Sequence, residues 1–280
     1  MTKFSKAPDI GKHIDMNKSA LHKVNVLGTG VTVCDYDSAT EQIVKLGLKR
    51  QSSAVTASAT HLLLEAWRSE KLRARINLFD IVTPDGQPVR WGQNLVGKAG
   101  LKERVSGPEL TIRLCRRAAA SGLKIFLYGS TERVVQTMKK NLSDQIEGLD
   151  FVGIQPSRFR PATPEEDQAD IDMINASGAH ICFVGLGCPR QENWAYEHLG
   201  SVNAVMICVG AAFDFHAGLL ARAPGWMQDY GLEWLFRLIR EPRRLWARYA
   251  VNNPLYLYLL FLQYTGLKKF PIVISKSIAD

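Results

Sequence analysis

The chain has 280 residues, of which 46% are hydrophobic and 22% are charged, a composition typical of a folded globular protein. It excludes a chain that is disordered throughout, and the formal net charge of +8 favours anionic partners such as nucleic acid, anionic lipid or phosphorylated substrates. The five cysteines form no C-x-x-C pair and most lie in apolar runs, so we expect buried free thiols in a reducing compartment.

Segment 1–23 is polar and has no apolar stretch of the kind found in signal peptides, so we predict a flexible N-terminal tail. After it, short apolar runs alternate with longer amphipathic ones. The predicted strands are Val24–Leu27, Val31–Val33, Ser53–Thr56, Leu78–Val82, Lys124–Tyr128, Phe151–Ile154, Ile181–Val184 and Val205–Val209. The predicted helices are Ser38–Leu48, Ala59–Ser69, Val89–Val96, Pro108–Ser121, Glu132–Leu142, Pro164–Ala176 and Pro189–His198.

Strands that alternate with helices favour βαβ units, so we predict an α/β fold with a Rossmann-like, mainly parallel sheet flanked by helices over residues 24–221. Ligands in such folds bind beyond the carboxyl ends of the strands. The alternation stops after Gly218, and Ala223–Leu262 is rich in Trp, Tyr, Leu and Arg. We therefore predict a separate helical appendage over residues 222–280. Its apolar run Pro254–Leu262 is too short to span a bilayer.

Asp85 stands in a Thr-Pro-Asp-Gly segment directly after the predicted strand Leu78–Val82. That position places its carboxylate in the expected ligand crevice, where it can act as a general base toward an acceptor hydroxyl. Pro-Asp-Gly is also a common turn, in which the Asp side chain bonds the local backbone. A purely structural turn is therefore the alternative.

Gly129 and Ser130 follow another predicted strand and precede a helix. Free N–H groups at the start of that helix can hold a phosphate. Ser130 or Thr131 can equally serve as an ordinary helix cap, which leaves a plain turn as the alternative.

Gly185 and Gly187 match half of a dinucleotide fingerprint, but the third glycine is missing and we expect Pro189 at the first position of a helix. The segment fits better as a turn that lets backbone approach a nucleotide, with Arg190 or Gln191 nearby. A tight turn without a ligand is the alternative.

Two Asp-x-Asp segments, Asp35–Asp37 and Asp170–Asp172, match a divalent-metal pattern by letters alone. The first stands just ahead of a predicted helix, where caps are expected. The second lies within a helix, where positions i and i+2 point to different faces. No His/Cys cluster has metal-ligand spacing, and we read His216 as a packed histidine. We expect neither a metal nor a cofactor.

The predicted appendage carries arginines at spacings of three to four, namely Arg237, Arg240, Arg243, Arg244 and Arg248. Aromatic residues stand between them. This pattern suits an anionic membrane surface, with Arg on phosphates and Trp and Tyr at headgroup depth. The same arginines can neutralise a pyrophosphate. The alternatives are a helical lid with a solvated basic face and a nucleic-acid surface, which the high Trp content disfavours.

Several segments together resemble the WecG/TagA/CpsF glycosyltransferases of bacterial polysaccharide and teichoic acid assembly, from about Asn25 to Leu262. The segments that carry the resemblance are Leu78–Gly86, Lys102–Gly107, Phe126–Gly129, Gly185–Glu192, Val209–Asp214, Arg222–Pro224 and Gly231–Leu238. The resemblance implies an inverting, metal-independent transferase in cell-surface or exopolysaccharide biosynthesis. It implies a nucleotide-sugar donor, for which we expect UDP, and a polyprenyl-diphosphate-linked saccharide acceptor. It also implies a peripheral position on the cytoplasmic face of the plasma membrane, with docking through the appendage. We expect no nucleic-acid partner, and a homo-oligomer stays possible.

The resemblance places the catalytic base at Asp85 and further functional positions at Thr56, Gln191, Arg104 and Arg237. We expect Thr56 and Gln191 to position donor or acceptor, and the two arginines to stabilise the departing diphosphate. One departure concerns specificity. The family usually has Thr-Pro-Asn where this chain has Thr56-Ala57-Ser58, and Ser58 is shorter and has no amide. A donor other than the usual amino sugar is one consequence.

Two other function classes stay open on the sequence alone. One is an NAD(P)-dependent oxidoreductase built on Gly185 and Gly187. The other is a non-enzymatic basic module that binds membrane or nucleic acid.

Overall fold

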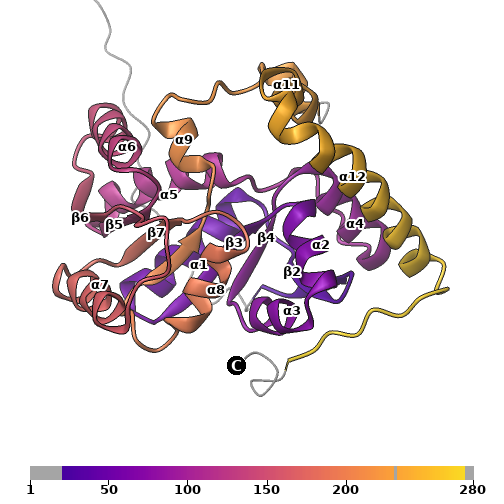
Figure 1. Ribbon diagram of the computed structural model, residues 1–280, viewed down its shortest axis with the longest axis horizontal. Helices are drawn as coiled ribbons and strands as arrows, with labels where there is room; N and C mark the ends of the chain where they lie inside the picture. Colours follow the sequence, from indigo (N-terminus) through magenta and orange to yellow (C-terminus); the bar gives the residue numbers. More distant parts are fainter. Residues whose placement is uncertain (1–20, 230–231, 275–280) are drawn as a thin grey trace, which may run out of the picture.

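A six-stranded, fully parallel sheet forms the centre of the computed structural model, which describes residues 21–229 and 232–274 (Figure 1). The strand order is β4-β3-β8-β7-β5-β6. The strands are β3 (Ser53–Ser58), β4 (Ile81–Pro84), β5 (Lys124–Gly129), β6 (Asp150–Gln155), β7 (Ile181–Gly185) and β8 (Val205–Cys208). Because all six strands run the same way, their carboxyl ends share one edge of the sheet.

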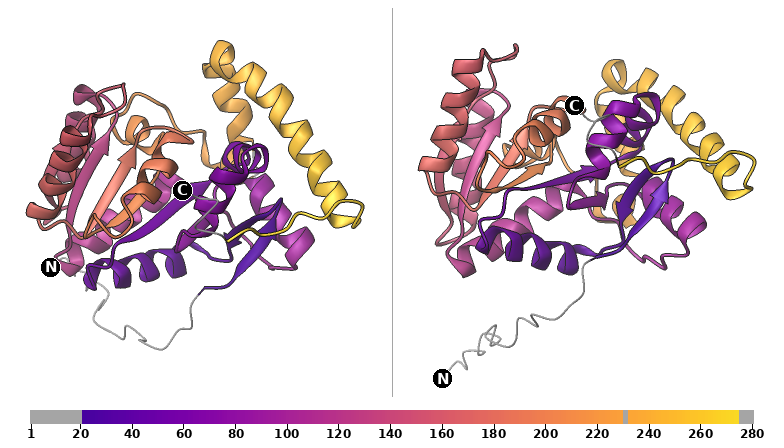
Figure 2. Two further views of the ribbon diagram at one scale, coloured as in Figure 1. Left: turned by 60° about the horizontal axis from the view of Figure 1, so that its bottom comes forward. Right: turned by 90° about the horizontal axis from the view of Figure 1, so that it is seen from below.

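Helices cover both faces of this sheet (Figure 2). One face packs against α1 (Tyr36–Leu48), α5 (Gly107–Ser121), α6 (Glu132–Gln145) and α9 (Ala212–His216). The other packs against α2 (Thr60–Arg68), α3 (Glu70–Asn77), α7 (Pro164–Ala176) and α8 (Arg190–Glu197). Along β5, Ile125 and Leu127 enter the first core while Phe126 and Tyr128 enter the second, which is the two-residue period of a strand.

The predicted Rossmann-like α/β fold is confirmed, with corrections to individual elements. The first two predicted strands are β1 (Lys23–Val26) and β2 (Thr29–Thr32), which form a separate antiparallel hairpin. Lys23, assigned to the tail, already begins β1, while residues 1–20 of that tail lie outside the described residues. The strand predicted from Leu78 begins at Ile81, because α3 occupies the preceding residues and Leu78 and Phe79 still bond its last carbonyls.

Three helices, α10 (Gly225–Asp229), α11 (Glu233–Arg240) and α12 (Pro242–Tyr264), follow the sheet. The last packs on α2 and on α4 (Gln87–Gly97), which follows β4. Tyr256 is fully buried there and its hydroxyl donates to the Pro88 carbonyl at 3.0 Å, while Leu259 and Leu260 enter the second core. Over the described part of the chain, no helix is both long and apolar enough to cross a bilayer. The division at residues 221 and 222 stays a prediction.

Candidate active site

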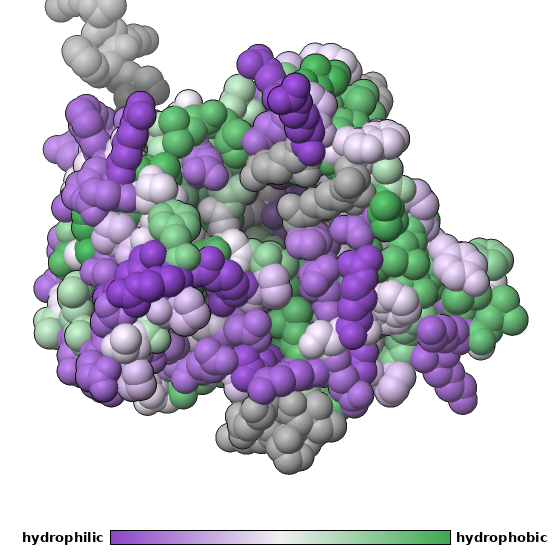
Figure 3. All heavy atoms as spheres, in the orientation of Figure 1, coloured by the Kyte–Doolittle hydropathy of each residue, from purple (hydrophilic) through white to green (hydrophobic). Residues whose placement is uncertain are grey.

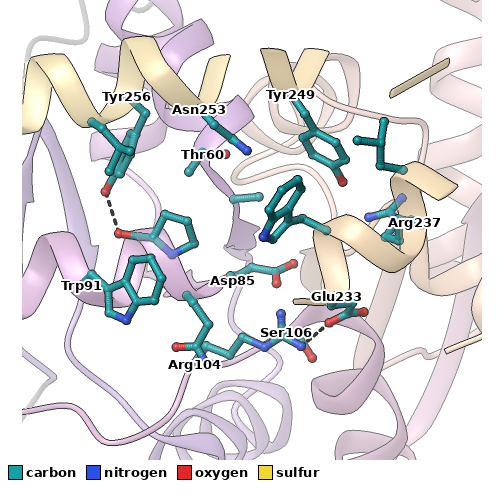
Figure 4. Close-up of a pocket in the computed structure, with 18 of the residues that line it drawn as sticks. Thr60, Asp85, Trp91, Arg104, Ser106, Glu233, Arg237, Tyr249, Asn253 and Tyr256 are labelled. Atoms are coloured by element: carbon teal, nitrogen blue, oxygen red, sulfur yellow. Dashed lines mark hydrogen bonds and ion pairs between the residues drawn. The ribbon is translucent and has the colours of Figure 1, made fainter. Parts of the chain in front are cut away.

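A cavity of about 570 Å³ lies between the end of β4 and the helices α11 and α12 (Figure 4). Its polar part contains Asp85, Arg104, Glu233 and Arg237. Its apolar wall is formed by aromatic and aliphatic side chains from α4, α11 and α12, namely Trp91, Trp234, Leu238, Trp246, Tyr249 and Leu257. The cavity therefore combines charged groups with a large apolar surface.

Asp85 lies at the carboxyl end of β4, as its place in the sequence predicts. Its backbone N–H donates to the Ser58 carbonyl at 3.0 Å, which ties the end of β4 to that of β3. Gly86 follows with φ of +94°, a conformation that L side chains rarely adopt, and α4 begins at the next residue. The Gly107 N–H, at the start of α5, donates to Asp85 Oδ2 at 3.4 Å.

Burial raises the pKa of Asp85 to about 6; Arg104 opposes this rise and Glu233 adds to it. A carboxylate with that pKa is mostly deprotonated at neutral pH yet more basic than an ordinary aspartate. A carboxylate with these properties can act as a general base toward a hydroxyl group.

Arg104 and Arg237 both face the cavity. Arg104, in the segment between α4 and α5, forms an ion pair with Glu233 in the first turn of α11. Arg237 stands one turn further along α11, and its buried Nε has no hydrogen-bond partner. Neither the pairing of Arg104 nor the position of Glu233 follows from the sequence, because the two residues are 129 positions apart.

Thr56 and Gln191 do not line this cavity. Both are buried beside it and donate to the same carboxylate oxygen, Glu192 Oε1, at 3.0 Å and 2.9 Å. Burial raises the pKa of Glu192, and the hydrogen bonds from Gln191 and Thr56 oppose the rise. Gln191 lies under Gly210, whose neighbours Val209 and Ala211 line the cavity. Apart from its place next to Gln191, no sequence pattern identifies Glu192 as the centre of this cluster.

Ser58 lies at the end of β3, fully buried, and its Oγ has no hydrogen-bond partner. A longer amide at this position would need space that is packed here. Ser58 pairs with Pro84, the last residue of β4, and the Ser58 carbonyl accepts the hydrogen bond from the Asp85 N–H.

Gly129 and Gly185 pair with each other at the ends of β5 and β7. A Cβ at Gly129 would lie 2.7 Å from the Gly185 backbone, and one at Gly185 would lie 2.7 Å from the Phe213 ring. Close packing therefore requires both glycines, whatever they contribute to ligand binding.

Replacing Gly129 with Ala is expected to destabilise the protein by about 2 kcal/mol or more, because φ of +112° and the contact with Gly185 both oppose a Cβ. Gly148→Ala is the matched control, since Gly148 also has a positive φ but no neighbour within 4 Å. Urea unfolding of both variants measures the difference. Equal losses would mean that the contact with Gly185 contributes nothing.

Ser130, Gly187 and Arg190 lie at the same edge of the sheet but outside the cavity lining. The Ser130 N–H donates to the Gly185 carbonyl at 2.9 Å, and Thr131, not Ser130, caps α6. Gly187 has φ of +80° and open space around it, and Arg190 is exposed. The prediction that Pro189 takes the first position of a helix was wrong, because Pro189 is the N-cap of α8.

The remaining predicted arginines follow the cavity along α11 and α12. Arg240 and Arg243 are exposed, and the Arg240 guanidinium lies 5.3 Å from the centroid of the Phe236 ring. The side chains of Arg244 and Arg248 lie outside the described part of the structure.

The acidic pairs are engaged with protein groups. Asp35 caps α1 in a capping box, Asp170 accepts hydrogen bonds from Arg158 and Tyr128, and Asp172 accepts one from Gln168. Within residues 21–229 and 232–274, no three His, Cys, Asp or Glu side chains gather as metal ligands would. The His216 Nε2 bonds the Pro108 carbonyl at 2.9 Å, which agrees with a packed histidine.

The family comparison covers nearly the whole chain. The model of the glycosyl transferase WecG/TagA/CpsF family matches residues 24–270, from the first strand to beyond the end of α12. This match includes every segment that forms the cavity. With its parallel sheet and its acidic and basic cavity at the strand ends, the chain belongs to the WecG/TagA/CpsF family and is a glycosyltransferase of cell-surface polysaccharide synthesis.

Proposed function

We propose that this protein transfers a sugar from a UDP-sugar to a polyprenyl-diphosphate-linked saccharide, with inversion at the anomeric carbon and without a metal. The observation that carries the proposal is Asp85, a base with a pKa of about 6 in a cavity that also contains two arginines. Family membership supports a nucleotide-sugar donor and a lipid-linked acceptor in general terms.

In this reaction Asp85 takes the proton of the acceptor hydroxyl as its oxygen attacks the anomeric carbon of the donor. The new glycosidic bond forms while the bond to the nucleotide diphosphate breaks, and the electron pair leaves with the diphosphate. Arg104 and Arg237 stabilise the growing negative charge on that leaving group. A diphosphate needs no proton to leave, so one base is sufficient for the protein's part. Thr56 and Gln191 hold Glu192 beside the cavity through their hydrogen bonds to its carboxylate.

The apolar wall of the cavity suits an acceptor that carries an isoprenoid chain. Trp91, Trp246 and Leu257 offer it a surface next to the charged groups. Outside the cavity, apolar side chains gather along the edge of the molecule that α12 forms (Figure 3). This edge is the surface that we propose for peripheral docking on the inner face of the plasma membrane.

Replacing Phe261 and Leu267 with Ser is expected to lower binding to vesicles with anionic lipid by about tenfold or more, because both side chains are over half exposed (55% and 72%) and would enter the lipid interface. The matched control replaces Leu48 and Met173, which are exposed on α1 and α7 (52% and 44%). Sedimentation with vesicles measures both. Equal binding by the two double variants would remove this surface from the proposal.

The reaction itself is tested with a panel of labelled nucleotide sugars, a polyprenyl-diphosphate-linked saccharide acceptor, and EDTA in the buffer. Transfer from one donor that persists in EDTA and yields an inverted linkage supports the proposal. Strict dependence on an added divalent metal, or retention of configuration, contradicts it. Gly185 and Gly187 offer no comparable support for an oxidoreductase, since close packing accounts for Gly185 and neither glycine lines the cavity.

A further inference from the structure

The cavity contains two acidic and two basic side chains, and one acidic and one basic side chain among them form an ion pair (Figure 4). Arg104 forms its ion pair with Glu233, and these side chains are only 14% and 17% exposed. Between the described residues Arg104 and Asp85, no ion pair within 4.0 Å is formed. The Arg104 guanidinium is therefore already paired with Glu233 and must leave it to bind an anion in the cavity.

Arg237, unlike Arg104, has a hydrogen-bond donor without a partner. It lies on the same face of α11 as Glu233, one turn away, and its Nε is buried without a hydrogen-bond acceptor. A buried donor without a partner is costly, and an arginine donor most of all. The cavity thus contains one arginine that an internal carboxylate neutralises and another that has a free donor.

From this arrangement we infer that Glu233 is a positioning residue that binds Arg104 and releases it when the diphosphate group of a substrate binds. The inference rests on the proposed function for the identity of the anion. It adds an exchange of partners, in which a phosphate replaces the Glu233 carboxylate on Arg104 and also accepts from Arg237.

Three physical arguments support the exchange. A phosphate can accept two parallel hydrogen bonds from a guanidinium and carries more charge than a carboxylate, so it is the stronger partner. Glu233 is in the first turn of α11, where the helix dipole stabilises a negative charge, so losing Arg104 does not leave its carboxylate without compensation. A diphosphate beside Asp85 and Glu233 would also bring like charges together, which favours the departure of Glu233 from the centre.

The exchange predicts that Glu233 competes with anions. Replacing Glu233 with Gln keeps the shape of the side chain and removes its charge, so inorganic pyrophosphate is expected to bind about tenfold more tightly. Titration calorimetry measures this without any sugar transfer. Adding Arg104→Ala to the same chain is expected to abolish the gain, because the gain depends on the released guanidinium.

Two further variants separate competition from general effects. Glu109→Gln makes the same charge change at a glutamate that also pairs with two arginines, Arg113 and Arg222, but lies outside the cavity lining. It is expected to leave pyrophosphate affinity within about twofold of the wild type, since surface charges are well screened. Glu233→Ala also removes the charge and is expected to raise pyrophosphate affinity in the same way, which keeps the test valid if the Gln variant unfolds.

The source of the diphosphate is identified by repeating the titration with UDP and with geranyl diphosphate. A gain for UDP places the leaving group of the donor at Arg104, and a gain for geranyl diphosphate places the lipid diphosphate of the acceptor there. Unchanged affinity of Glu233→Gln for pyrophosphate and both diphosphates would overturn the inference. A gain in affinity without sugar transfer from any donor would instead count against the proposed function alone.

Discussion

Asp85→Asn is expected to lower the rate of sugar transfer by about 100-fold or more, because the amide cannot accept the proton of the acceptor hydroxyl. Asn has nearly the same shape, and the backbone N–H of residue 85 keeps its bond to the Ser58 carbonyl. The fall should therefore appear in kcat, with donor affinity little changed. Single-turnover assays with labelled donor measure the chemical step, and near-normal turnover of the variant would refute the role of Asp85 as base.

The pH dependence gives a second readout of the same residue. Because burial raises the pKa of Asp85 from 3.8 to about 6, the wild-type rate is expected to fall as the pH drops below about 6. Glu233 contributes to the raised pKa, and Arg104 opposes it. In Glu233→Gln the carboxylate that raises the pKa of Asp85 is gone, while Arg104 still lowers it. The acidic limb of the rate profile should therefore move to lower pH.

The stability of the fold should depend on pH in the opposite sense to the transfer rate. A carboxyl whose pKa is higher in the folded than in the unfolded state stabilises the fold below pH 3.8, and this contribution is lost as the pH rises through about 6. At pH 8 the charged Asp85 thus opposes folding, and Asp85→Asn is expected to be more stable than the wild type. Thermal unfolding at pH 5 and pH 8 measures this, and it also shows that lost activity is not lost structure.

Tyr256→Ala is expected to lower the free energy of unfolding by about 3–5 kcal/mol, because a fully buried aromatic ring leaves a cavity when it is truncated. The ring lies between α12 and α4, and its hydroxyl bonds the Pro88 carbonyl. Removing it should also loosen α12 and with it one wall of the site, so transfer activity should fall at temperatures well below unfolding.

Tyr258→Ala is the matched control on the same helix. It makes the same chemical change two residues away, at a side chain that is 59% exposed, and is expected to alter stability by no more than about 0.5 kcal/mol. Urea unfolding of both variants gives the comparison. Similar losses in the two would mean that α12 is not anchored through Tyr256.

The sequence predicted the sheet well because each strand is a short apolar run bounded by polar turns, and buried parallel strands have that pattern. It missed α3 because Ser69 alone separates that helix from α2, and it missed α9 because five residues carry little periodic signal. The hairpin of β1 and β2 has the same local pattern as the central strands, so only tertiary structure distinguishes it.

The position of Asp85 could be predicted because it depends on one strand, whereas contacts between distant segments could not be predicted. Asp85 follows directly from its place after an apolar run. The pairing of Arg104 with Glu233, and the common contact of Thr56 and Gln191 with Glu192, join segments that are more than a hundred residues apart. No local pattern encodes which of several carboxylates will meet a given arginine.

The cavity joins residue 85 to a wall formed by residues 233–257, and this has a consequence for the order of events during synthesis. The sheet strands and Asp85 are translated before α11 and α12, and amino-terminal parts generally fold first as a chain emerges from the ribosome. A nascent chain can therefore present Asp85 on a folded sheet while Arg237 and the aromatic wall are still absent. The cavity described above is therefore complete only after α12 has been made.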